Sequence, residues 1–585
     1  MFGLRSLSAL SLGFAFLCCC GDVELLCARP NATPEAESDT ISGTVLNSVT
    51  HEPVGRALVY SPDNRFATLT DSAGHFEFTV PSSESDRRSE RPELFSGPTT
   101  ISPTQQTRAP IFLMARKPGF LSNQNSSQFT PPMLVSPGQK DITIYLVPAG
   151  LIAGRVTVSG SDSPEKMEVE IYRRQIQNGS ARWASAGTFR TWSNGEFRFP
   201  ELTPGTYKLF THELMDRDPL TFNPRGQLYG YPPVYFPGAN NFAAGSPIQL
   251  SPGKTFKADL SLTRREYYPV EIGIANAPEG IGLGVEVFTG GEGGPGYSLG
   301  YNSQQQKIQG MLPDGMYTVK AVSFGQSGAT GTVDISVKGS AATGYILTMA
   351  PNASISVNVT EEFTSTEARS DVSFSGPFNV NPGRRRRYLQ VMLEPADEIG
   401  QGNVVGLRQP SGPEDESLAL DNVQPGRYWV RVDSARGYAA SIQCGETDLL
   451  HHTLVVPAGG SSDPIELTMR DDGAQIDGII ENVPTNAGRS FIQLAQVQPH
   501  IYLIPSEDST GQFRELWASP DGHFSSGQIP PGDYQALAFD RPQPELEYRN
   551  KEAMRKFHAQ EKFIRLLAGQ KEELRLRMIS GSDER

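Results

Sequence analysis

One stretch near the middle of the chain has the residue spacing of a nucleophilic serine site. Residues 296–300 match the Gly-x-Ser-x-Gly pattern with Ser298 at the centre, but that motif needs a strand, a sharp turn and then a helix. A glycine-rich loop precedes the match, and no helical pattern follows it. Pro295 and the missing helix also exclude a phosphate cradle at the Gly-x-Gly-x-x-Gly match of residues 291–296. We expect neither chemistry here.

Histidines and carboxylates do not combine into a metal centre. His558 and Glu561 have His-x-x-Glu spacing, but His558 is the last histidine, so no later one completes a zinc ligand set. The remaining candidates, which lack ligand spacing for zinc or ligand number for calcium, are His451, His452, His523, Asp71 and Asp521. The two aspartates are expected to cap turns. The sequence therefore predicts no catalytic residue, no metal and no cofactor.

A dense group of aromatic residues, interleaved with Pro and Gly, is the candidate binding surface. Its members are Tyr229, Tyr231, Tyr235, Phe236 and Phe242. Flat rings on a rigid loop are suited to stacking against a sugar. The alternative is that they cover the open edge of a β-sheet. Trp183 and Trp192, which flank a predicted hairpin, raise the same question, and solvent exposure distinguishes the two interpretations.

The elements that position these residues are predicted by a phrase that recurs along the chain. Residues 195–207 and 522–534 both run from Gly-x-Phe to Pro-Gly-x-Tyr at the same spacing, and residues 312–317 and 423–428 are shorter copies. Such self-similarity indicates one small unit copied several times. In a β-sandwich the tyrosine of the phrase enters a strand with its ring inward and its hydroxyl near the edge, as in a tyrosine corner. We interpret the phrase as a folding element.

Composition favours a β-rich protein in several units. The chain has 585 residues with 58 Gly and 45 Pro, which is too many breaks for long helices. Its net charge of −14 is spread along the chain and disfavours nucleic acid as a partner. The basic run at residues 384–387 is expected in a solvated loop, with contact to an acidic polymer as the alternative.

The N-terminus has the layout of an export signal. Arg5 precedes an apolar stretch from Leu7 to Cys20, and small residues follow. We assign residues 1–28 to a signal peptide and 29–40 to a linker. The sequence around Cys20 resembles a bacterial lipoprotein signal in which Cys20 carries the lipid; simple cleavage between Cys20 and Ala28 is the alternative. Only Cys444 remains in the body, so no disulfide within a domain is expected.

Residues 41–149 resemble the carboxypeptidase regulatory-like domain. The matching residues are Gly43, Val45, Pro53-Val54-Gly55, Ala57, Val59, Thr70-Asp71, Gly74, Phe76, Phe78 and Arg116 to Phe120. This resemblance implies a seven-stranded sandwich related to transthyretin and to carbohydrate-binding folds. Residues 231–238 and 247–250 look like a segment common in large exported bacterial proteins built from such domains.

Together these observations predict an all-β chain of about five tandem Ig-like or transthyretin-like sandwiches, joined by short linkers into a semi-rigid string. The predicted units are 41–149, 150–266, 267–350, 351–472 and 473–585, with one short helix at residues 550–560 in the last. Met554 and Phe557 are expected to pack that helix on a sheet.

We expect a non-catalytic, exported cell-envelope protein that binds or scaffolds, with carbohydrate as the favoured ligand class. It would be secreted, periplasmic or at the cell surface. Its expected partner is a polysaccharide or an envelope protein, and its contact with a membrane would be through a lipid on Cys20. The alternatives are a structural spacer or adhesion stalk and, less favoured, an unrecognised hydrolase.

Overall fold

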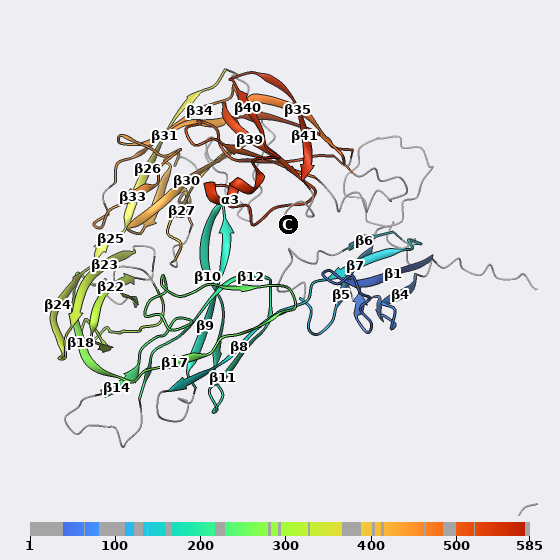
Figure 1. Ribbon diagram of the computed structural model, residues 1–585. Helices are drawn as coiled ribbons and strands as arrows, with labels where there is room; N and C mark the ends of the chain where they lie inside the picture. The colour runs from blue at the N-terminus through green and yellow to red at the C-terminus, as the bar shows by residue number, and fades with distance from the viewer. Residues whose placement is uncertain are drawn as a thin grey trace, which may run out of the picture.

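The computed structural model describes residues 39–63, 65–80, 111–121, 133–136, 138–158, 166–216, 228–278, 282–289, 294–323, 325, 328–364, 388–399, 404–410, 415–460, 462–483, 499–519 and 521–579. Within these residues the chain forms five β-sandwiches in tandem and one short helix near the C-terminus, which confirms the predicted fold class (Figure 1). The predicted signal peptide, Cys20 and the basic run at 384–387 lie outside the described residues. No helix in the described ranges is long and apolar enough to cross a membrane.

The first sandwich packs a three-stranded sheet, in the order β4-β1-β7, on a four-stranded sheet, in the order β3-β2-β5-β6. Seven strands of this sandwich lie in the described residues. They are β1 (Asp39–Asn47), β2 (Leu58–Tyr60), β3 (Ala67–Leu69), β4 (His75–Val80), β5 (Ile111–Arg116), β6 (Met133–Val135) and β7 (Ile142–Leu146).

The second sandwich packs the sheet β10-β9-β12-β15 on the sheet β11-β8-β16, with β17 also paired to β8. Its strands are β8 (Gly150–Val158), β9 (Glu168–Gln177), β10 (Ser180–Arg190), β11 (Glu196–Leu202), β12 (Gly205–Thr211), β15 (Ile248–Leu250), β16 (Thr255–Lys257) and β17 (Leu260–Leu262).

The third sandwich takes two strands from the segment predicted for the second. Strands β13 (Leu214–Met215) and β14 (Leu228–Tyr231) extend its first sheet, because β14 pairs with β18 (Arg265–Ala275). The other strands are β19 (Leu283–Thr289), β20 (Gly300–Asn302), β21 (Lys307–Pro313), β22 (Gly315–Ser323), β23 (Ala329–Val337), β24 (Ala342–Thr348) and β25 (Ala350–Pro351). The second and third sandwiches are thus joined by a shared stretch of chain.

The fourth sandwich packs the sheet β29-β26-β34-β31-β32 on the sheet β28-β27-β30-β33. Its strands are β26 (Ala353–Glu362), β27 (Leu389–Pro395), β28 (Val405–Gly406), β29 (Ala419–Val423), β30 (Gly426–Ser434), β31 (Tyr438–Cys444), β32 (Thr447–Asp448), β33 (Leu454–Val456) and β34 (Ile465–Arg470).

The fifth sandwich is folded from one continuous sheet in the order β37-β36-β39-β41-β35-β38, with β40 also paired to β39. Its elements are β35 (Ala474–Glu481), β36 (His500–Pro505), β37 (Arg514–Trp517), β38 (His523–Ile529), β39 (Gly532–Phe539), α3 (Lys551–Met554), the 3-10 turn η2 (Arg555–Phe557), β40 (Lys562–Leu566) and β41 (Lys571–Ile579). The helix is shorter than predicted, yet Met554 and Phe557 are buried against this sheet as expected.

All five sandwiches repeat one strand pattern. In each, the first strand pairs antiparallel with a hairpin strand on one side and parallel with a late strand on the other, as β1 does with β4 and β7. Glycine allows this close pairing. A Cβ on Gly154 would lie 2.0 Å from the carbonyl oxygen of Ala258 and 2.9 Å from the ring of Phe197, its antiparallel partner. The Gly-x-Phe part of the phrase therefore supplies a ring that covers a glycine.

The tyrosine of the phrase forms the predicted corner. Each of these side chains donates its hydroxyl hydrogen to the backbone oxygen four residues earlier. The pairs are Tyr207 with Thr203 at 2.6 Å, Tyr317 with Pro313 at 2.9 Å, Tyr428 with Gln424 at 2.9 Å and Tyr534 with Pro530 at 2.6 Å. Each ring is buried in its sandwich core. The phrase is a folding element, as the sequence predicts.

Tyr534→Phe should lower the free energy of unfolding of the fifth sandwich by about 1–3 kcal/mol. The change leaves the carbonyl of Pro530 without its donor and the backbone N–H of Gln512 without its acceptor, both of which Tyr534 contacts in a buried setting. Urea unfolding of the purified chain measures the loss. Tyr145→Phe, on a side chain that is 47% exposed, is the control and should change little. Equal effects of the two substitutions would contradict the corner as a source of stability.

Candidate functional site

The hairpin of β9 and β10 extends beyond its own sandwich. Strand β12 pairs with β9 only from Val169 to Arg173, so the outer part of the hairpin continues past the sheet toward α3 (Figure 1). The turn at the tip consists of Asn178 (φ 50°) and Gly179 (φ 76°). Positive φ at both central residues is the requirement of a type I′ turn, and Asn-Gly is its preferred sequence.

The tip contacts the fourth and the fifth sandwich at once. The Asn178 side chain donates to Glu394 Oε1 at 2.5 Å and accepts from Arg431 Nη1 at 3.2 Å. Arg549 belongs to the fifth sandwich, and its Nε donates to the Asn178 carbonyl at 3.1 Å. The backbone N–H of Arg549 also donates to the Gly179 carbonyl, at 3.1 Å. One turn of two residues therefore fixes two distant sandwiches.

Gly179 is required by the space that the tip enters. A Cβ at this position would lie 2.6 Å from three ring atoms of Tyr548. That ring cannot move aside easily, because it stacks on Phe513 with centroids 4.0 Å apart and planes at 6°. Burial raises the pKa of Tyr548 above its usual value. The guanidinium of Arg549 covers the ring of Trp429 at 4.0 Å.

Ion pairs and one backbone bond hold the stem of the hairpin. Arg174 lies 2.6 Å from Glu547, whose side chain is 13% exposed, whereas the partner of Arg173, Glu545 at 3.1 Å, is 63% exposed. Solvent screening makes the second pair the weaker one. On the other strand, the backbone N–H of Trp183 donates to the carbonyl of Glu398 at 2.8 Å.

The predicted aromatic binding surface lies mostly inside packed regions. Tyr235 and Phe242 are 2% and 1% exposed, and Phe210 joins them in a small cluster. Trp183 of the hairpin and Ile399 of the fourth sandwich pack against this cluster. These rings therefore join two sandwiches and have no free face for a sugar. This arrangement matches the alternative interpretation, in which the rings cover a sheet edge.

The three other aromatic candidates are placed separately. Tyr231 is 9% exposed and belongs to the core of the second sandwich, against which Phe236 also packs. Tyr229 is partly exposed, and the guanidinium of Arg264 lies 4.0 Å from its ring centroid. Trp192, by contrast, is 52% exposed. Sequence alone did not separate covered rings from open ones.

The side chains first considered for chemistry have structural partners. Ser298 Oγ donates to Glu213 Oε1 at 2.9 Å rather than contacting a histidine. His558 pairs with Glu561 at 3.1 Å, and among the described residues no group of three possible ligands gathers around one point. Asp71 caps its turn by accepting the backbone N–H of His75 at 2.8 Å. None of these contacts forms a catalytic arrangement.

His451 and the second aspartate have similar local roles. His451 Nδ1 lies 2.7 Å from Asp448 Oδ2 and its Nε2 lies 2.9 Å from the carbonyl of Ser509, so it links the fourth and fifth sandwiches. Asp521 accepts from the side chain of Ser519, which fits the predicted turn cap.

Two cavities lie between sandwiches. The larger, of about 1150 Å³, is lined by Asn178 at the hairpin tip, by β30 in the fourth sandwich and by β37 with the Tyr548 segment in the fifth. The smaller, of about 640 Å³, lies between the third and fourth sandwiches and includes Ser354 and Asp421. The larger cavity is the candidate functional site, because three sandwiches contribute to its wall.

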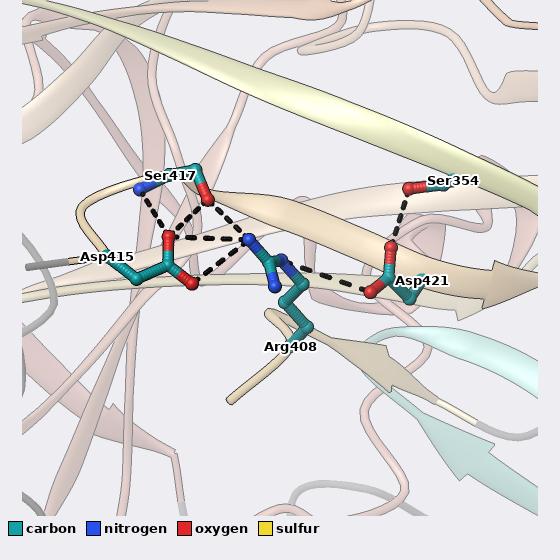
Figure 2. A network of polar contacts seen from close by, with 5 residues as sticks. All are labelled: Ser354, Arg408, Asp415, Ser417 and Asp421. Atoms are coloured by element: carbon teal, nitrogen blue, oxygen red, sulfur yellow. Dashed lines mark hydrogen bonds and ion pairs between the residues drawn. The ribbon is translucent and has the colours of Figure 1, made fainter. Parts of the chain in front are cut away.

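The polar groups beside the smaller cavity are paired (Figure 2). Arg408 lies between Asp415, at 3.1 Å, and Asp421, at 4.0 Å. Ser354 donates to Asp421 at 2.5 Å, and the N–H of Ser417 donates to Asp415 at 3.1 Å. This network fixes a loop of the fourth sandwich and provides no unpaired charge for a ligand.

A buried carboxyl group lies where the second and third sandwiches meet. Burial raises the pKa of Glu213 to about 7, although Ser298 donates to it from both N and Oγ and His212 is nearby. The hydroxyl of Tyr267 and Glu213 Oε2 are both buried, and neither has a hydrogen-bond partner among the residues that the structure describes. Burial also raises the pKa of Tyr297, to about 12. We therefore expect the stability of this junction to change with pH near neutrality.

Comparison with known proteins gives distant structural similarities. No protein-family model matches the chain, and no curated protein matches it. The Bacillus anthracis TIE protein is similar over 93% of this chain and 69% of its own, with 8% identity and a TM-score of 0.13.

Two pilus proteins are similar at the same level. The RrgB pilus protein of Streptococcus pneumoniae is matched over 74% of this chain and 98% of its own, at 8% identity and a TM-score of 0.14. The shaft pilin SpaA of Lactobacillus rhamnosus GG is matched over 39% and 97%, at 9% identity and a TM-score of 0.19. Similarities this low do not assign a family or a function.

Sequence reasoning missed the residues that join the sandwiches. The signal for the hairpin was present, since Asn178-Gly179 separates two alternating runs, which is the strongest short-range indication of a tight hairpin. The length of these runs, 10 and 11 residues, exceeds the commonest strand length of about 5–6 residues and could have indicated an extension. No local signal identified the partners Glu394, Arg431 and Tyr548.

Glu213→Gln should make the chain more stable than wild type at pH 8, by about 1–2 kcal/mol given partial solvent access. The folded-state pKa of about 7 exceeds the usual pKa of a free glutamate. Between these two pH values the folded chain therefore binds more protons than the unfolded chain. Stability from this group is therefore lost as pH rises through that window. Glutamine is uncharged and keeps an acceptor for Ser298.

Thermal unfolding at pH 5 and pH 8 tests this expectation. The advantage of Glu213→Gln should appear at pH 8 and shrink at pH 5, where wild-type Glu213 is mostly protonated. Glu77→Gln, at an exposed position, serves as the control. An advantage of the same size at both pH values would show that charge burial is not its cause.

Proposed function

We propose that this chain is a non-catalytic, exported cell-envelope protein that acts as a rigid scaffold or adhesion module. The observation that carries the proposal is the docking of the Asn178-Gly179 turn onto both the fourth and the fifth sandwich. Export is supported by the signal-like N-terminal sequence, with a lipid on Cys20 as the proposed anchor. Secretion and a periplasmic location fit the same signal.

Docking of the hairpin converts a linear chain of units into a closed arrangement. Asn178 and Glu394 are 216 positions apart, and Arg174 and Glu547 are 373 positions apart. The second sandwich thus contacts the third through shared strands and also contacts the fourth and the fifth (Figure 1). A semi-rigid string would allow contacts between neighbours only. Closure holds the surfaces of four sandwiches at fixed positions, which suits a scaffold.

Carbohydrate binding is a further proposal, and the exposed tryptophans support it. Trp192 and Trp517 are 52% and 64% exposed, so their faces are open where those of Tyr235 and Phe242 are not. Trp517 also lines the larger cavity. Open aromatic faces on rigid strands suit stacking on sugar rings. The expected partner is then an envelope polysaccharide, while a protein partner would bind elsewhere on the scaffold.

Gly179→Ala should open the closed arrangement. The added Cβ would meet the ring of Tyr548 at 2.6 Å, so the hairpin tip must leave its position. Small-angle scattering of the purified mature chain should then show a larger radius of gyration. Gly339→Ala is the matched control, because Gly339 has a similar positive φ of 59° but nothing within 4 Å of the added atom. Unchanged scattering for Gly179→Ala would refute closure by the hairpin.

Retention of the mature protein on immobilised polysaccharides tests carbohydrate binding. Trp517→Ala should lower retention at least about tenfold if the ring stacks on sugar, a factor that corresponds to a loss of about 1.4 kcal/mol of binding free energy. Phe563→Ala changes another exposed ring of the same sandwich and measures how far contact extends. If wild-type protein is retained on no polysaccharide, carbohydrate binding is refuted and the scaffold role alone remains.

A further inference from the structure

The hairpin tip contains a residue pair with a chemistry of its own. In an Asn-Gly pair the backbone nitrogen of the glycine can attack the side-chain amide of the asparagine, because glycine has no Cβ in the way. This chain has two such pairs, Asn178-Gly179 and Asn194-Gly195. The first docks on the fourth and fifth sandwiches, whereas the second lies in the loop after β10, at the other end of that strand. The two pairs thus differ in whether docking covers them.

Deamidation at the tip needs water and no other reactant. The backbone nitrogen of Gly179 forms a bond to Cγ of Asn178, and the side-chain nitrogen leaves as ammonia together with the proton of the Gly179 N–H. Water then opens the succinimide ring that results. Breaking the bond from the ring nitrogen to Cγ gives aspartate at position 178, while breaking the bond from that nitrogen to the backbone carbonyl carbon gives isoaspartate. Both products carry a negative charge that asparagine lacks.

The closed arrangement holds both reacting groups in place. The side chain of Asn178 donates to Glu394 at 2.5 Å and accepts from Arg431 at 3.2 Å, so it is not free to turn toward the glycine nitrogen. Gly179 is buried beside the ring of Tyr548. Attack on the amide therefore requires the tip to leave its position first.

The product does not fit the position that the turn occupies. The side chain of an aspartate has no N–H to donate, and it would place a carboxylate against Glu394, which is only 8% exposed. Two carboxylates in contact repel each other strongly where solvent is largely excluded. Arg431 does not compensate the added charge, because it already lies 3.0 Å from Asp433 and 3.8 Å from Glu394. Isoaspartate also adds one atom to the main chain and so changes the shape of the turn.

We propose that Asn178 is a deamidation site that the closed arrangement protects, and that its deamidation prevents an opened chain from closing again. The inference rests on the proposed closed scaffold and adds a covalent modification to it. Asp-Gly also forms type I′ turns, so conversion to aspartate leaves the hairpin intact and acts on its docking. The modification thus separates chains that have opened from chains that have stayed closed.

Peptide mapping by mass spectrometry of the full mature chain, incubated in mildly alkaline buffer, tests the protection. Asn178 should deamidate at least about tenfold more slowly in the native chain than in urea, and at least about tenfold faster in native Arg549→Ala than in native wild type. That substitution removes the guanidinium that donates to the Asn178 carbonyl. Asn194 is the control in the same sample, and Arg549→Ala should leave its rate unchanged. Equal rates at Asn178 in native chain and in urea would refute protection, as would equal rates in wild type and Arg549→Ala.

Small-angle scattering tests whether the product prevents closure. Asn178→Asp should have a larger radius of gyration than wild type, and the control Asn194→Asp should not. Adding Glu394→Gln to Asn178→Asp should restore the wild-type radius, because the glutamine amide then donates to the new carboxylate. A compact Asn178→Asp chain would refute the block, and a double variant that stays open would show that Glu394 is not its cause. If Gly179→Ala opens the chain and Asn178→Asp does not, the inference fails alone; if neither opens it, the closed arrangement fails as well.

Discussion

The contact between the Asn178-Gly179 turn and Tyr548 is the constraint on which the arrangement of the later sandwiches depends. Both turn residues have positive φ, and the second must lack a side chain because the ring of Tyr548 occupies the space beside it. Stacking on Phe513 fixes that ring in turn. A short turn therefore reaches a rigid aromatic surface, and its backbone carbonyls bind Arg549. Few residue types other than glycine could be accommodated at position 179.

Within each sandwich the dominant constraint comes from local contacts, and the sequence predicts it. The Gly-x-Phe and Pro-Gly-x-Tyr elements act between residues that are close in sequence or in neighbouring strands, as Phe197 does on Gly154 and Tyr207 does on Thr203. Local constraints of this kind must be repeated in every copy of a small unit. The recurring phrase therefore predicted the sandwiches and their corners, and the spacing of Met554 and Phe557 predicted the buried face of the C-terminal helix.

Contacts between sandwiches left no comparable pattern. Phe242 has the composition and setting of a binding residue, but Ile399 and Trp183 cover the region in which it lies. Periodicity along a strand shows which face is apolar and does not show whether that face meets its own sheet, another sandwich or a ligand. Burial of Tyr235 and exposure of Trp517 follow from chain segments far away in sequence. The candidate site was for this reason outside the reach of sequence alone.

Closure and the larger cavity have a common cause. The contacts that bring the hairpin, β30 and the Tyr548 segment together also form the wall of this cavity. They engage the nearby carboxylates, since Glu394 is used at the hairpin tip and Asp433 pairs with Arg431. By linkage, a ligand that bound only the closed arrangement would stabilise that arrangement in proportion to its occupancy.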